Sequence, residues 1–180
     1  AVSIGSTGTL GGTGLVAATT IQNGGLISPG NSIGTLSVET LTIDGGGGYV
    51  WEVADVTGAA GTDYDLISVG AGTGNVTFNA TAGSPFTIYL TSFTGFTNWD
   101  AGGTFSWNII DWGTVTGFDS AAFAVNTNDF SGAVSGAFTF ANTNGFLVMS
   151  YAAGTPTYDT NSGTWSAGFV PALANGSNVL

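Results

Sequence analysis

The 180-residue sequence contains no lysine, arginine, histidine or cysteine. Histidine, cysteine and lysine supply most general acids, general bases and nucleophiles in enzymes, so their absence excludes most catalytic mechanisms. Without cations, the chain lacks the usual electrostatic basis for binding nucleic acid. Without cysteine, it has no disulfide framework. These absences favour a structural protein over an enzyme, and we expect neither catalytic residues nor a nucleic-acid partner.

The charge of the chain has one sign. All 11 charged side chains are Asp or Glu, which gives a formal net charge of −11 at pH 7. Because no side-chain ion pair can form, each carboxylate must face solvent, accept hydrogen bonds or bind a metal ion. Repulsion keeps copies of the chain apart, and divalent cations or low pH would weaken it. Trypsin-like proteases find no Lys or Arg to cut, which suits a protein exposed outside the cell.

The apolar content is sufficient for a folded core. Hydrophobic residues make up 43% of the chain, with 12 Phe, 5 Trp and 5 Tyr, so disorder is not expected despite 31 glycines. No run of about 18 apolar residues is present, so we expect no membrane insertion. We interpret Ala1, which is not a Met, as the mature end left by signal-peptide cleavage. We therefore expect a secreted or cell-surface protein.

Short runs of β-branched and aromatic residues alternate with Gly, Thr, Ser and Asn, which is the pattern of short strands joined by turns. No ten-residue window shows helical periodicity. The expected strands are Thr7–Leu10, Leu15–Ala18, Leu26–Ser28, Gly34–Val38, Thr40–Ile43, Tyr49–Val53, Tyr64–Val69, Asn75–Asn79, Phe86–Thr91, Thr104–Ile110, Ala122–Val125, Ala137–Ala141, Phe146–Tyr151 and Thr164–Val170. The sequence thus predicts an all-β fold.

Strand length changes along the chain. Residues 1–48 read as short rungs of a parallel β-solenoid with an N-terminal arm, because strands of three or four residues alternate with tight turns. In residues 49–154 the strands lengthen and aromatic residues appear, which fits a longer-stranded β-solenoid or a β-sandwich. Residues 155–180 read as a C-terminal strand or arm. We expect the three parts to form one continuous elongated domain.

Two stretches resemble known exported proteins. Residues 24–38 (GGLISPGNSIGTLSV) include a turn at 29–32, where Pro fixes φ and Gly supplies a positive φ. This stretch resembles the G-x-L-x-P-G-N-S-x-G-T-L segment of autotransporter-associated β-strand repeats. Residues 49–69, followed by FTIYLTSF and FSWNIIDW, resemble the module that follows such repeats in exported PEP-CTERM proteins of Gram-negative bacteria. The resemblance implies export, a surface or matrix location, a β-solenoid-like fold and no catalytic residues.

Asp63 and Asp65 are the candidate metal ligands. If Asp65 begins a strand, side chains two residues apart point to one face. Two carboxylates and a backbone carbonyl there would supply part of the oxygen shell that Ca²⁺ requires. No D-x-D-x-D-G loop is present, so the alternative is a polar entry into a strand. Calcium is the one cofactor that the sequence brings into consideration.

A carboxylate pair of the glycosidase type is the one common enzyme class that the composition leaves open. Glu52 is the candidate acid, because a hydrophobic neighbour such as Trp51 raises the pKa of a carboxyl group. Asp100 and Asp111 also lie beside tryptophans. Strand alternation instead places Trp51 and Glu52 on opposite faces, which favours a core tryptophan and an exposed acid. The remaining tryptophans suit either a core or a glycan-binding face: Trp99, Trp107, Trp112 and Trp165.

These observations lead to the hypothesis of a non-catalytic extracellular structural protein. Copies of the chain would assemble into a filament, sheath or surface layer by inter-subunit β-strand addition. A terminal arm, Ala1–Val16 or Gly168–Leu180, would pair with an exposed sheet edge of the next copy. Head-to-tail contacts that do not close produce a fibre. The alternative is an adhesin module that binds cell-surface glycans, with or without Ca²⁺.

Overall fold

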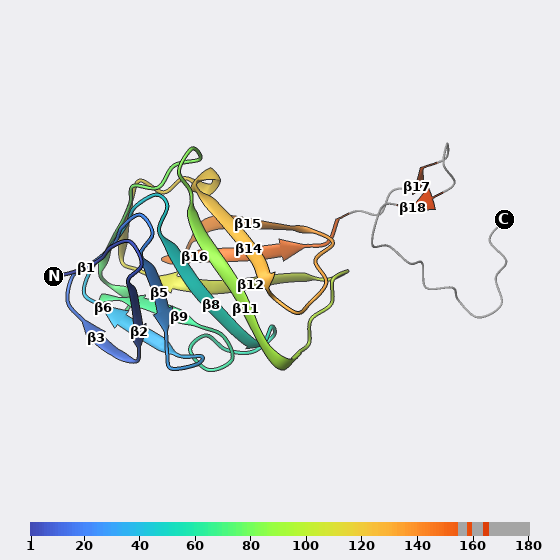
Figure 1. Ribbon diagram of the computed structural model, residues 1–180, viewed down its shortest axis with the longest axis horizontal. Helices are drawn as coiled ribbons and strands as arrows, with labels where there is room; N and C mark the ends of the chain where they lie inside the picture. Colours follow the sequence, from blue (N-terminus) through green and yellow to red (C-terminus); the bar gives the residue numbers. More distant parts are fainter. Residues whose placement is uncertain (155–157, 160–163, 166–180) are drawn as a thin grey trace.

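The computed structural model describes residues 1–154, 158–159 and 164–165. The chain winds through three β-sheets, and each of the early turns adds one parallel strand to each sheet (Figure 1). This arrangement is a β-solenoid, because the sheets grow by stacking turns along one axis. The predicted all-β fold is confirmed. The longer strands beyond residue 48 continue the solenoid, so of the two folds considered for this part the structure has the longer-stranded β-solenoid and not the β-sandwich.

Each sheet collects one strand from each turn. Sheet A contains β1 (Val2–Ile4), β4 (Thr19–Ile21), β7 (Leu41–Ile43), β10 (Asn75–Phe78) and β13 (Thr114–Thr116). Sheet B contains β2 (Thr9–Gly12), β5 (Leu26–Pro29), β8 (Gly48–Asp55), β11 (Phe86–Thr97) and β14 (Phe123–Asp129). Sheet C contains β3 (Gly14–Val16), β6 (Thr35–Val38), β9 (Leu66–Val69), β12 (Thr104–Asp111), β16 (Phe146–Ala152) and β15 (Ala137–Thr143). The remaining elements are η1 (Gly70–Gly72), η2 (Ser120–Ala122) and the antiparallel pair β17 (Tyr158–Asp159) and β18 (Thr164–Trp165).

Successive turns pair in register but grow in length. In sheet A, Val2 pairs with Thr19, Thr19 with Leu41, Leu41 with Val76, and Val76 with Val115. The sequence interval between partners therefore increases toward the C-terminus. The longest strands, β8, β11 and β12, lie in the later turns and widen the solenoid there (Figure 1). Because β5 pairs with β8 and β6 with β9, residues on both sides of position 48 belong to the same sheets.

Sheet C ends in a hairpin instead of another parallel strand. β16 runs antiparallel to β12, and β15 runs antiparallel to β16. Asn144 and Gly145 connect the two strands with φ of 51° and 81°, the left-handed conformations that suit Asn-Gly in a tight hairpin turn. Two antiparallel steps give β15 the same direction as β12. β15 is therefore parallel to every earlier strand of its sheet, including β3.

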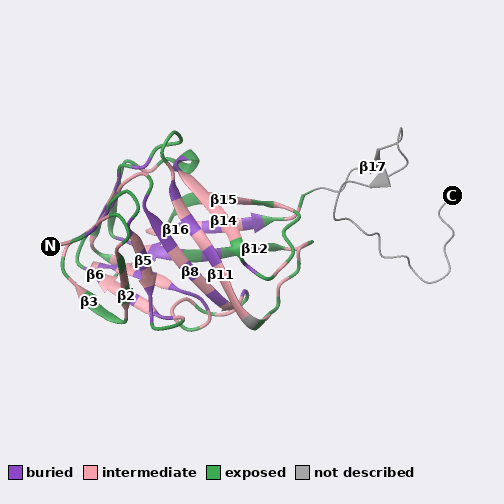
Figure 2. Cartoon of the chain, viewed as in Figure 1, coloured by how far each residue is buried: buried purple, intermediate pink, exposed green. Residues whose placement is uncertain are grey.

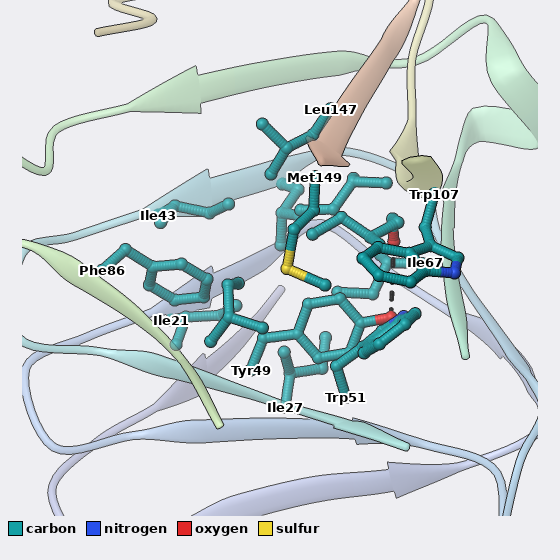
Figure 3. Close-up of a cluster of buried hydrophobic side chains, with 14 of the residues drawn as sticks. Ile21, Ile27, Ile43, Tyr49, Trp51, Ile67, Phe86, Trp107, Leu147 and Met149 are labelled. Atoms are coloured by element: carbon teal, nitrogen blue, oxygen red, sulfur yellow. Dashed lines mark hydrogen bonds between the residues drawn. The ribbon is translucent and has the colours of Figure 1, made fainter. Parts of the chain in front are cut away.

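The core consists of side chains that stack along the solenoid axis. Ile27 pairs with Tyr49, Tyr49 pairs with Ile88, and all three are fully buried. Figure 2 shows buried residues alternating with less buried ones along β8 and β11, as expected of strands that cover a core with one face. Figure 3 shows Tyr49 and Met149 pointing into the same interior. Because successive strands pair in register, the apolar residues of each turn stack on those of the next and form a continuous core.

The turn at 29–32 explains one of the glycines. Gly30 has a φ of +83°, and a Cβ at this position would collide with the carbonyl oxygen of Ser32. Only glycine therefore fits without a shift of the backbone. Gly30 and Gly12 exchange two main-chain hydrogen bonds of 2.9 Å, which join this turn to the preceding one. The positive φ predicted for Gly30 is confirmed.

The N-terminal residues are not a free arm. Strands β1, β2 and β3 pair with β4, β5 and β6, so residues 2–16 form the first turn of the solenoid. The expectation of a free arm in residues 1–16 is therefore wrong, because the strands in this segment already pair with strands of the same chain. The other expected arm, residues 168–180, lies outside the described residues. None of the helices in the described part of the chain is long and apolar enough to cross a membrane.

Candidate functional site

The two ends of the solenoid are the surfaces at which the sheets stop. At the N-terminal end, β1, β2 and β3 each pair with one neighbour within the described residues, which leaves one edge of each strand available. Leu15 of β3 is 71% exposed, the largest exposed fraction of any large apolar side chain in the described residues. Such edges carry main-chain N–H and C=O groups able to pair with another β-segment.

At the C-terminal end, the last strands of the three sheets are β13, β14 and β15. Each of them also pairs with one neighbour within the described residues. β13 and β14 are parallel to the preceding strands of sheets A and B, and β15 has the direction of β3. All three sheets therefore present the same strand direction at both ends. A second copy placed on this end in the same orientation would meet parallel strands in every sheet.

An apolar groove opens at this end, between β14 and β15. It has a volume of about 450 Å³. Its apolar lining comes from alternate residues of the two strands: Phe123 and Val125 of β14, and Phe138 and Phe140 of β15. All four are half-buried, whereas the equivalent positions of the inner turns are buried. The last turn thus leaves its part of the core partly uncovered.

The groove has a rigid floor and an uncharged lining. The rings of Phe123 and Phe140 stack with centroids 4.8 Å apart and an interplanar angle of 25°. Phe123 also meets the buried ring of Phe78 edge-on at 5.4 Å. The short helix η2 forms the rim and is capped by Asp119, which accepts a 2.9 Å hydrogen bond from the backbone N–H of Ala121. No lining residue carries a charge.

Sequence reasoning found the strands of this groove but not the groove itself. The runs at residues 122–125 and 137–141 were predicted as strands, and the large apolar side chain at every second position is the signal for one buried face. Which strands lie at the end of a sheet depends on pairing between distant residues, so the sequence pattern alone does not reveal it.

Asp65, one of the two predicted metal ligands, is fully buried. Its Oδ1 accepts a hydrogen bond of 2.8 Å from the backbone N–H of Gly34, and its Oδ2 accepts one of 3.0 Å from that of Glu52. Its main-chain carbonyl accepts a 2.9 Å bond from the Trp51 indole. Burial raises the pKa of the Asp65 carboxyl to about 7; the two N–H donors lower it, and the negative charge of Glu52 adds to the rise. Asp65 therefore fastens the segment before β6 to β8.

Asp63 has a different set of partners. Its Oδ2 accepts a 2.7 Å hydrogen bond from the backbone N–H of Ala59, within a local turn. Both aspartates precede β9 rather than lying in it, so the strand geometry that would align their carboxylates does not apply. In the described part of the chain, no group of three or more Asp or Glu side chains is placed to hold a metal ion. The calcium site at Asp63 and Asp65 stays a prediction.

The carboxylates considered for glycosidase chemistry lie in different parts of the fold. Glu52 is half-buried on β8, where burial raises its pKa, and Trp51 points to the opposite side, as alternation predicted. Asp111, at the end of β12, accepts hydrogen bonds of 2.9 Å from Ser68 Oγ and 2.7 Å from the Val69 N–H. Asp100 is exposed in the turn before β12, where it accepts a bond from a backbone N–H. Each of the last two acids is occupied in holding local structure.

The tryptophans serve mainly as core residues. Trp51, Trp107 and Trp112 are buried, and the rings of Trp51 and Trp107 pack with centroids 5.4 Å apart. Trp99 is half-buried; it stacks on Phe105 at 5.1 Å, and its indole donates to the carbonyl of Ala133. These contacts agree with the core interpretation rather than with an open platform for glycans. The side chain of Trp165 lies outside the described residues.

No protein-family model matches the chain, and no curated protein matches it as a relative.

Proposed function

We propose that this chain is a non-catalytic structural protein of the cell exterior, and that its copies join end to end by β-strand addition into a filament, sheath or surface layer. The observation that carries the proposal is the pair of open solenoid ends. In the described residues, three strand edges are available at each end, and they have matching directions. A resemblance to exported repeat proteins and the absence of His, Cys and Lys support the same assignment.

The physical reason is the behaviour of stacked turns. Each turn of a solenoid covers its neighbour, so a terminal turn lacks half of its cover unless something caps it. Here the terminal turns expose Leu15 at one end and a phenylalanine-lined groove at the other. Main-chain hydrogen bonds contribute roughly 0.5–1.5 kcal/mol each, and covered apolar surface adds about 25 cal/mol per Å². Both terms would therefore stabilise a contact between copies.

Charge would regulate this assembly. Copies with a net charge of −11 repel one another at neutral pH and low salt. Protonation, bound divalent cations or added salt would weaken the repulsion, whose range is about 10 Å at 0.1 M ionic strength. The same composition suits exposure to proteases that cut after Lys or Arg.

The test is to examine the purified full chain by negative-stain electron microscopy and light scattering, over a range of protein concentration, pH, salt and Ca²⁺. We expect elongated particles whose mass increases with concentration, and more of them at lower pH or higher salt. A single monomeric species under all of these conditions would refute the proposal. Saturable binding of a glycan by such a monomer would instead favour the adhesin.

A further inference from the structure

The groove between β14 and β15 combines two features of a strand-accepting site. Its apolar lining is half-buried, so side chains of an incoming segment would complete a core that is already partly formed. Both bordering strands also have an edge without a partner in the described part of the chain. Main-chain pairing and side-chain pockets together are what β-strand addition uses.

We propose that this groove receives residues 166–180 of a second copy, which add as a strand between the edges of β14 and β15. This inference rests on the proposed assembly by β-strand addition and names the two surfaces that make the contact. The acceptor is the groove lined by Phe123, Val125, Phe138 and Phe140. The donor is a segment that the structure leaves outside its described residues.

The donor follows from what the rest of the chain already does. The N-terminal candidate is excluded, because residues 2–16 pair in all three sheets of their own chain. The segment 166–180 follows β18 and ends at Leu180. Extended chain spans about 3.3–3.6 Å per residue, so these 15 residues reach roughly 50 Å, long enough to cross onto a neighbour.

The chemistry of the donor fits the acceptor. Residues 160–180 contain no Asp or Glu, although the chain as a whole carries 11. The side chains of the donor therefore bring no charge into the uncharged groove. It also carries large apolar side chains that suit half-buried phenylalanine rings: Phe169, Val170, Leu173, Val179 and Leu180.

The test uses full-length variants at both surfaces. Leu173→Asp places a charge in the donor, and Thr139→Glu places one in the groove, where Thr139 is an exposed lining residue. Thr143→Glu is the matched control, because Thr143 is an exposed threonine of the same strand that does not line the groove. Leu15→Asp alters the opposite end of the solenoid. We measure the concentration at which each variant assembles, by light scattering and electron microscopy.

We expect Leu173→Asp and Thr139→Glu each to raise the assembly concentration about tenfold or more, as a lost contact of modest strength would. Thr143→Glu and Leu15→Asp should stay within about twofold of wild type, since their contacts are not used. A synthetic peptide of residues 166–180 should inhibit assembly of the wild-type chain, and a peptide of the same composition in scrambled order should not. If the Thr139→Glu variant does not fold, the Leu173→Asp variant and the peptide inhibition still test the inference.

The outcomes separate this inference from the proposed function. If Leu15→Asp blocks assembly while Leu173→Asp does not, the solenoid ends stack directly on each other; the inference then fails and the proposed function stands. If the segment cross-links to the groove of its own chain in a monomer, the inference fails as well. If the wild-type chain never assembles, the proposed function fails first.

Discussion

Asp65 should make the folded state less stable as pH rises from about 4 to about 8. The group is fully buried, and burial raises its pKa from an ordinary 3.8 to about 7. Between these two values, the folded chain holds a proton that the unfolded chain has released. Stability is therefore highest below pH 4 and decreases as pH rises through the folded pKa.

The magnitude follows from the two pKa values. A tenfold difference in proton affinity corresponds to about 1.4 kcal/mol, so a pKa of about 7 against 3.8 gives roughly 4 kcal/mol at full effect. This is a large part of the 5–15 kcal/mol that stabilises a typical domain. The two N–H donors from Gly34 and Glu52 favour the ionised carboxylate, but burial outweighs them.

The perturbation is Asp65→Asn, which removes the titration. Asparagine presents an NH₂ group to one of the two N–H donors, so a constant cost of about 1–3 kcal/mol is expected at all pH values. The informative quantity is therefore the difference in unfolding free energy between wild type and variant as a function of pH. We expect this difference to move by roughly 4 kcal/mol between pH 4 and pH 8, so that the variant changes from less stable than wild type at pH 4 to more stable at pH 8.

The assay is denaturant unfolding followed by tryptophan fluorescence, because Trp51 donates to the Asp65 carbonyl and is fully buried. Measurements at low protein concentration keep the equilibrium between folded and unfolded monomers. Glu52→Gln is a second variant: it removes the nearby negative charge, so the pKa of Asp65 should decrease. A difference that stays constant across this pH range would refute the assignment of a protonated, buried Asp65.

Two further predictions test the backbone and an exposed carboxylate. Gly30→Ala should destabilise the chain more than Gly95→Ala, measured by denaturant unfolding; both have positive φ, worth about 1–2 kcal/mol for alanine, but only at Gly30 does a Cβ meet the backbone. Equal losses would contradict the steric account. Asn98→Ala should raise the pKa of Asp55, measured by NMR titration, because the Asn98 side chain is the largest cause of its lowered value. An unchanged titration would show that the pair is not formed in solution.

The long strands were predictable because their side chains carry the signal locally. The run from Phe86 onward and the run from Thr104 onward are rich in aromatic and β-branched residues, and both became strands close to the predicted bounds, with β11 extending further to Thr97. Such residues favour extended backbone wherever one face is covered. The predicted solenoid architecture likewise followed from short strands alternating with Gly-rich turns.

Within the three large sheets, three strands were missed, and all three belong to sheet A, whose remaining three-residue strand, β7, was predicted. Val2–Ile4, Thr19–Ile21 and Thr114–Thr116 are too short to show a period of two, and each exists because a stacked neighbour fixes its register. The closing hairpin did carry a local signal, because Asn144-Gly145 is a strong two-residue turn.

The candidate site also combines features that the local sequence indicates with features that depend on distant residues. Asp63 and Asp65 were expected to point to one face because residues two apart in a strand do so, but both residues precede β9. The buried Asp65 carboxylate instead accepts hydrogen bonds from the N–H groups of Gly34 and Glu52. The groove required knowledge of which strands end their sheets. Which strands end a sheet is decided by pairing between residues far apart in sequence, and local sequence patterns do not reveal that pairing.

The difference between the two ends would give the proposed assembly a direction if it is built on contacts between unlike ends. One end offers a short, uncharged first turn with Leu15 exposed, and the other offers a wider turn with an apolar groove whose rim helix η2 is capped by Asp119. Because the two surfaces are not alike, a contact between them is heterologous, and a heterologous contact that does not close into a ring continues as a fibre. Contacts between two like ends would instead stop at a dimer. For the proposed assembly, we therefore expect a polar filament with every copy in the same orientation.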